Sequence, residues 1–159
     1  MDVNRITFQR ERAQDVFQEM LPLLEKHWEE IAHFKDILLE PDTETYFRME
    51  DMGILRVFTA RDENGILIGY NVFFIKHNLH YKSSLNALQD ILFIHPDYRK
   101  GTIGTRLIKW CDEELRAEGV QVVYQHLKAK KELDFSALLE RIGYHFVDKI
   151  YARRLDGGK

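Results

Sequence analysis

One stretch, residues 91–108 (ILFIHPDYRKGTIGTRLI), constrains the fold more than any other. It begins as an apolar strand pattern, breaks at a His-Pro pair, and resumes beyond two glycines with the period of an amphipathic helix. Gly119 suits the left-handed cap that ends many helices, and the apolar run VQVVYQHL follows at 120–127. A helix of this length between two strands forms a right-handed crossover, so the sequence predicts parallel strands at 87–94 and 120–127.

The periodicity elsewhere adds antiparallel strands and further helices. Residues 54–62 and 65–77 are rich in β-branched and aromatic residues and are separated by the turn cluster DENG, which predicts a hairpin. The other expected elements are a strand at 4–9, a helix at 12–25, a helical region at 28–51 interrupted by EPDTE, a short helix at 134–141 and a final strand at 144–155. Together they predict a mixed α/β fold with a central sheet flanked by helices.

Length and composition fit one domain over residues 1–159, because 45% hydrophobic content fills a single core. No window approaches the roughly 20 apolar residues of a membrane span. The first ten residues lack the apolar core and cleavage site of a secretory signal, so a soluble, cytoplasmic protein without a membrane partner is expected. The single cysteine, Cys111, excludes an internal disulfide. It lies on the apolar stripe of a helix, as a core residue or alternatively as a catalytic thiol.

Charge is divided unevenly along the chain, although the net charge is only −3. Residues 1–63 carry 15 acidic and 8 basic side chains, whereas residues 64–159 carry 11 acidic and 15 basic ones. The second part is suited to an anionic ligand and the first to a cationic one, and the same counts fit a solvated surface. The negative total and the lack of a basic stripe interleaved with aromatics argue against nucleic acid as a partner.

The turn at 99–105 has the composition of an anion site at a helix N-terminus. Its glycines remove side chains where backbone approaches a ligand, and its other residues add cations and hydroxyls: Arg99, Lys100, Gly101, Thr102, Gly104 and Thr105. Neither a nucleoside triphosphate loop nor a dinucleotide fingerprint is present. The composition favours a diphosphate, and a strand-to-helix turn without a ligand is the alternative.

The segment HPDYRKGTIGTRLI resembles the coenzyme A signature of the GNAT superfamily of N-acetyltransferases, a Q/R-x-x-G-x-G/A turn between a strand and a helix. Arg99 takes the first place of the motif and Gly104 the last, while Thr102 stands where the family usually has glycine. The resemblance extends to GYNVFFI, ALQDILFI and LLERIGYHFV, which look like the family's third strand, fourth strand, and late helix with last strand. A softer resemblance is to small acetyltransferases of tailed bacteriophages.

The resemblance implies an acetyl-CoA-dependent N-acetyltransferase that needs no metal. The family's sheet splays, so that backbone groups of Leu92, Phe93 and Ile94 contact the pantetheine arm and the thioester. The pyrophosphate is held by Arg99, Lys100, Gly101, Thr102, Ile103, Gly104 and Thr105. The amine acceptor, a small molecule or a protein, attacks directly in a ternary complex, and a homodimer is possible. The alternative is a coenzyme A-binding or partner-binding module that has lost transfer.

Proton transfer requires a base and an acid near the thioester. Asp90 interrupts an apolar central strand, either as the base or as a buried carboxylate with a structural partner. His126, near the end of the facing strand, is the second candidate base. The resemblance implies a tyrosine as the acid, but Leu139 occupies its place, so Tyr144, Tyr124 or solvent is expected to protonate the thiolate.

Two other groups of residues suggest weaker hypotheses. His27 and His33 are six residues apart and have no cysteine partners, which argues against a metal site. In the family this helical region forms a lip of the acceptor pocket, so its acidic residues either recognise an amine or are solvated. The lysines around Lys128 either approach the nucleotide or are solvated.

Overall fold

A computed structural model describes residues 5–158 of the chain. Its helices and strands follow in the order β1 (Thr7–Glu11), α1 (Ala13–Ile31), α2 (Thr43–Asp51), β2 (Leu55–Arg61), β3 (Leu67–His77), β4 (Leu85–Ile94), α3 (Ile103–Ala117), β5 (Val122–Tyr124) and α4 (Ser136–Arg141). Short 3₁₀ turns lie at Pro96–Tyr98 and Lys131–Leu133. The described residues contain no helix that is both long and apolar enough to cross a membrane.

The strands form one mixed sheet in the order β1-β2-β3-β4-β5. The first four are antiparallel neighbours, and β4 and β5 are parallel, which confirms the predicted hairpin and crossover. The pairing of β4 with β5 covers only three positions, from Asn86 opposite Val122 to Leu88 opposite Tyr124. The predicted strand 120–127 is therefore longer than the observed β5. After Tyr124 the two strands no longer pair, and the sheet splays.

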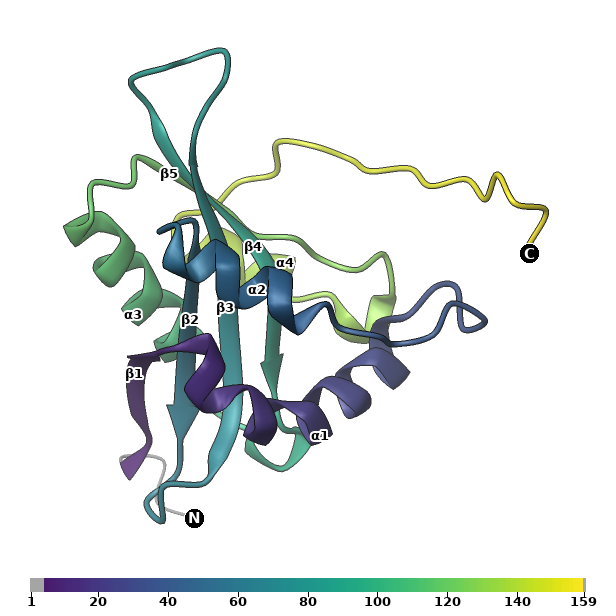
Figure 1. The fold of residues 1–159 in the computed structure, drawn as a ribbon. Helices are drawn as coiled ribbons and strands as arrows, with labels where there is room; N and C mark the ends of the chain where they lie inside the picture. Colours follow the sequence, from purple (N-terminus) through teal and green to yellow (C-terminus); the bar gives the residue numbers. More distant parts are fainter. Residues whose placement is uncertain (1–4, 159) are drawn as a thin grey trace.

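Helices cover both faces of the sheet, with α1 and α2 on one side and α3 on the other (Figure 1). Accordingly, β2 and β3 are buried on both faces and form two core clusters. On the α3 side Leu107, Cys111 and Leu115 pack against the sheet, so Cys111 is a core residue as predicted. On the other side the stripe Val16, Met20 and Leu24 of α1 does the same.

The N-terminal boundaries differ from the prediction. The first strand starts at Thr7 and ends at Glu11, and the part predicted at residue 4 lies outside the described residues. The helix predicted at 12–25 continues to Ile31, and the region predicted as a second helix is a loop over 32–42 followed by α2. EPDTE starts a helix, because the side chain of Asp42 accepts a hydrogen bond from the backbone of Thr45 at 3.0 Å.

The final strand predicted at 144–155 is wrong, since this segment, hereafter the tail, has no regular secondary structure. Figure 1 shows it leaving α4 and running outward to the side of the molecule. Its apolar residues are exposed, with Ile150 80% and Tyr151 87% accessible. Near its end Arg154 pairs with Asp36 at 3.0 Å. The sequence pattern suits a strand, but no described strand of this chain pairs with it.

Candidate active site

A β-bulge in the central strand β4 determines how Asp90 is placed. Ile91 pairs with Val72 of β3 and Gln89 pairs with Phe73, so Asp90 lies between them without a partner residue on β3. A bulge of this kind re-aims the side chain of the extra residue. Asp90 is directed to the α2 side of the sheet, where it contacts that helix.

Asp90 and Tyr46 form the closest polar contact of the site. The Tyr46 hydroxyl donates to Asp90 Oδ2 at 2.6 Å, and both side chains are half-buried. Burial raises the pKa of Asp90, while the Tyr46 hydrogen bond and the charge of nearby His126 act in the opposite direction. Burial and the bond to Asp90 raise the pKa of Tyr46. Sequence reasoning missed Tyr46, because no motif separates it from the aromatic core residues around it.

His126 lies where β4 and β5 begin to diverge. Its backbone N–H donates to Gln89 Oε1 at 2.8 Å, and its Nδ1 lies 2.7 Å from the Gln89 carbonyl oxygen. A carbonyl can only accept, so Nδ1 is the donor and Nε2 remains able to take a proton. The structure thus brings Asp90 and His126 together at the splay. Beyond it, Leu92, Phe93 and Ile94 have no β5 partner in the described pairing.

The turn before α3 presents free backbone donors. Gly101 has a φ of +108°, whereas Thr102 has a φ of −109° and needs no glycine. Gly101 therefore provides the conformational freedom of the turn, one residue before the place where the family usually has glycine. The first N–H groups of α3 lack intrahelical acceptors, and a Cβ built on Gly104 meets no atom within 4 Å. These residues fit a pyrophosphate, because a helix N-terminus offers unpaired backbone donors and no protein atom fills the space beside Gly104.

Arg99 is held against two neighbouring elements. Its Nε donates to the Ile94 carbonyl at 2.7 Å, and its guanidinium pairs with Glu30 of α1 at 2.8 Å. The same group lies over the ring of Phe93, 5.2 Å from its centre. Arg99 therefore ties the end of β4 to α1, and Lys100 is a second exposed cation of the turn.

An apolar pocket of about 400 Å³ lies between α1, the loop 32–42 and the sheet. Its walls include Phe17, Leu24, Trp28, Leu38, Val72 and Ile91. Tyr46 also lines it, so the residue that binds Asp90 is part of the wall. Lys128 lines the pocket as well, and Lys130 donates to the Glu30 carbonyl at 2.7 Å. Lys128 is thus at the pocket, and Lys130 is bound to α1.

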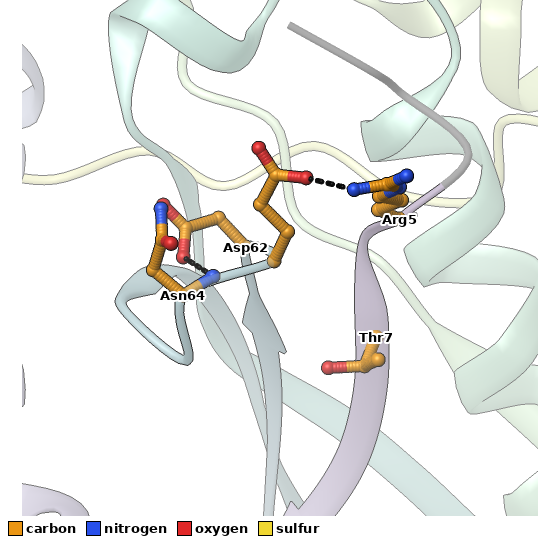
Figure 2. Close-up of a pocket in the computed structure, with 5 residues that line it drawn as sticks. Arg5, Thr7, Asp62 and Asn64 are labelled. Atoms are coloured by element: carbon orange, nitrogen blue, oxygen red, sulfur yellow. Dashed lines mark hydrogen bonds and ion pairs between the residues drawn. The ribbon is translucent and has the colours of Figure 1, made fainter.

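A second hollow, of about 600 Å³, lies by the turn between β2 and β3 (Figure 2). Its wall is polar, and Arg5 pairs there with Glu63 at 3.0 Å. Asp62 accepts the backbone N–H of Asn64 at 2.9 Å. Asp62 also accepts the Tyr98 hydroxyl at 3.1 Å. None of the residues predicted for the site lines this hollow, so it is not the candidate active site.

Comparison with known proteins identifies the family. A family model described as an acetyltransferase (GNAT) domain matches residues 54–146, more than half of the chain. The chain belongs to the GNAT acetyltransferase family. Members of this family use acetyl-CoA. No curated protein matches the sequence.

Solved GNAT structures share the fold over nearly the whole chain. An aminoglycoside acetyltransferase, HMB0005, from an uncultured soil metagenomic sample gives a TM-score of 0.75 at 14% identity, covering 95% of this chain and 99% of that one. Ribosomal-protein-alanine N-acetyltransferase from Brucella melitensis biovar Abortus 2308 gives 0.70 at 18%, covering 94% and 99%. AAC(6')-Iy, in complex with the bisubstrate analogue CoA-S-monomethyl-acetylneamine, gives 0.66 at 15%, covering 94% and 97%.

Tyr144 lies on the other side of the GNAT sheet from Tyr46. Its hydroxyl donates to Asp112 of α3 at 2.6 Å, and burial, then Asp112, raise its pKa. Asp90 instead contacts Tyr46 of α2. The predicted residues Asp90 and Tyr144 therefore do not belong to one hydrogen-bonded group. Leu139 is buried and packs in the core.

Of the two histidines considered for a metal site, His27 lies in α1 and His33 in the loop 32–42. His27 is buried, with Nδ1 3.1 Å from the Tyr70 hydroxyl, and burial followed by the charges of Lys128 and Arg99 lowers its pKa to about 4. His33 lines the apolar pocket instead. Residues 5–158 contain no group of three or more His, Cys, Asp or Glu arranged to hold a metal ion.

Proposed function

We propose that this GNAT protein is an N-acetyltransferase that transfers an acetyl group from acetyl-CoA to a primary amine by direct attack in a ternary complex. The observation that carries the proposal is the position of Asp90. It occupies a bulge of β4, next to the place where β4 and β5 separate, and bonds to a residue of the apolar pocket wall. A carboxylate between the splay and the apolar pocket is suited to deprotonate an acceptor.

The residues assigned to acetyl-CoA fall in two places. Backbone N–H groups from Ile103 to Thr105, with Lys100 and the free space at Gly104, bind the pyrophosphate. Backbone groups of Leu92, Phe93 and Ile94 bind the pantetheine arm along the open side of β4. Acetyl-CoA supplies a thioester whose acetyl group passes to the amine nitrogen, so that a C–N bond forms while the C–S bond breaks.

Asp90 accepts the proton that leaves the amine. Burial raises its pKa, which brings the carboxyl closer to the pH at which a general base is effective. The Tyr46 hydroxyl fixes its orientation. His126 is the alternative base, since its Nε2 is available and it lies close to Asp90. The thiolate takes its proton from Tyr144 or from solvent.

A catalytically inactive coenzyme A-binding module on the same fold is the alternative. The observation in its favour is that Leu139, at the place of the family's usual proton donor, is a buried core residue. Transfer to amines distinguishes the two proposals, whereas acetyl-CoA binding alone does not.

Asp90→Asn tests the proposal, because it preserves the shape and removes the charge. We expect turnover to fall by about 10² to 10⁴ fold with acetyl-CoA affinity unchanged. The control is Asp15→Asn on the exposed first turn of α1, which should retain full activity. Near-normal turnover of Asp90→Asn would transfer the role of base to His126 or to solvent. Absence of transfer by the wild-type protein to a broad amine panel would favour the inactive module.

Assembly as a homodimer in the cytoplasm is part of the proposal. In an extended tail, Phe146 and Ile150 lie on one face and Val147 and Tyr151 on the other. Apolar residues on both faces are typical of a strand covered on both sides. β5 is at the edge of the sheet, so each of two copies can offer an edge to the tail of the other.

The cytoplasm is where acetyl-CoA is available.

A further inference from the structure

The composition of the apolar pocket indicates which class of amine can serve as the acceptor. Its walls from α1 and the sheet are carbon-rich, contributed by side chains such as Phe17, Trp28 and Val72. An acceptor with many hydroxyl or amino groups would bury them there without partners, which is unfavourable. An acceptor with an apolar body would instead bind favourably, because its apolar surface and that of the walls are removed from water together. The pocket therefore selects against polyhydroxylated amines.

The loop 32–42 supports the same conclusion. Ile37 and Leu38 line the pocket, yet 52% and 78% of their surfaces are exposed. Adjacent exposed apolar side chains beside a cavity are typical of a surface that a ligand covers. Figure 1 shows this loop projecting beyond the end of α1, at the side where α2 begins.

Charged groups at the pocket define the polar end of the acceptor. Tyr46 connects the wall to Asp90, which gives one position for an amine nitrogen. Lys128 lines the same pocket, and its charge contributes to the lowered pKa of buried His27. Glu40 lines the pocket too, so the few charged groups of its wall differ in sign. Because most of the wall is apolar, the additional amines of a polyamine would find few hydrogen-bond partners there.

We propose that the acceptor is a primary monoamine carried on an aromatic or branched aliphatic body. This inference rests on the proposed function, because it assigns the pocket beside Asp90 to the acceptor. The apolar body lies among the side chains of α1 and the loop 32–42, and the amine lies at Asp90. Aminosugars and polyamines are excluded as good substrates by the same contacts.

The test compares 2-phenylethylamine with glucosamine and spermidine, in binding by calorimetry and in acetyl transfer with acetyl-CoA. We expect 2-phenylethylamine to bind and to have the highest kcat/KM. Leu38→Asn should weaken its binding about tenfold, since an apolar contact is lost. The matched control, Leu79→Asn, changes a 96% exposed leucine of the β3–β4 hairpin loop outside the pocket wall and should leave binding unchanged. Both positions are exposed, so folding is retained, which circular dichroism checks.

Each result separates this inference from the proposed function. Binding of 2-phenylethylamine that weakens in Leu38→Asn, without transfer to any amine, supports the acceptor class and refutes the transferase. A tenfold higher kcat/KM for glucosamine or spermidine supports the transferase and overturns the acceptor class. No binding of 2-phenylethylamine, or equal weakening in Leu38→Asn and Leu79→Asn, also overturns it.

Discussion

At Asp90 a single carboxyl group is subject to opposing influences. Burial raises its pKa, and the hydrogen bond from Tyr46 lowers it. Tyr46→Phe removes only the second influence, so the pKa of Asp90 should rise and the acid limb of the pH–rate profile should move to higher pH. Carboxyl-carbon NMR shifts over a pH titration measure the same pKa without an acceptor. Tyr144→Phe is the control and should not shift it, since Tyr144 bonds to Asp112. An unchanged Asp90 pKa in Tyr46→Phe would contradict this assignment.

His27 should make the stability of the protein depend on pH. Its pKa is about 4 in the folded chain, below the ordinary value of 6.5, because it is buried. Between these values the unfolded chain binds a proton that the folded chain does not. Stability from this group is therefore complete above about pH 6.5, and about 3 kcal/mol is lost as pH falls to about 4.

His27→Phe should remove that part of the pH dependence, because phenylalanine does not titrate. Urea unfolding at several pH values between 4 and 7 measures the difference between variant and wild type. The control His80→Phe lies in the exposed β3–β4 loop and should retain the wild-type slope. Parallel stability curves for His27→Phe and the wild type would show that another group causes the acid sensitivity.

At the scale of elements, the start of α3 offers a steric test of coenzyme binding. A Cβ built at Gly104 meets no protein atom within 4 Å, so Gly104→Val should leave the fold intact. It should reduce acetyl-CoA affinity tenfold or more, about 1.4 kcal/mol per tenfold, because the side chain occupies the space assigned to the pyrophosphate. Calorimetry measures affinity, and Gly104→Ala should give a smaller loss. Unchanged affinity in a folded Gly104→Val would remove the turn from the site.

Elements whose signals are local could be predicted from the sequence. The DENG turn gave the β2–β3 hairpin, and the alternation of strand and helix periods around Gly101 gave the parallel pair β4 and β5. Elements that depend on distant partners were predicted less well. The extent of β5 depends on where β4 stops pairing, and the strand predicted for the tail requires a neighbour that the chain itself does not provide.

At the scale of the whole molecule, the site combines segments that are far apart in the sequence. Asp90 was identifiable as a carboxylate within an apolar strand, but its contact with Tyr46 joins positions 44 residues apart. Likewise, the apolar pocket is built from α1, the loop 32–42 and the sheet, which no single motif encodes. The sequence therefore indicates the local chemistry of Asp90 and the α3 turn, while tertiary packing determines the groups that surround them.

The exposed tail is the feature of the whole molecule that best tests the proposed homodimer. If each tail pairs with the other copy, Ile150 and Tyr151 are buried in the assembly although they are exposed in one chain. Ile150→Asp combined with Tyr151→Asp should then convert a dimer to a monomer, because buried unpaired charges are strongly unfavourable. Light scattering after size-exclusion chromatography at several concentrations measures the mass.

The matched control for the tail is Leu79→Asp, which adds a charge at a more exposed leucine outside the tail. It should remain dimeric. A monomeric wild-type protein, or a tail variant that stays dimeric, would contradict the exchange of tails. Retained folding of the variant by circular dichroism would exclude global unfolding as the cause of a lower mass. If the tail pairs with a second copy, only the tail variant should dissociate. The Leu79→Asp protein should stay dimeric, because its added charge lies outside the tail.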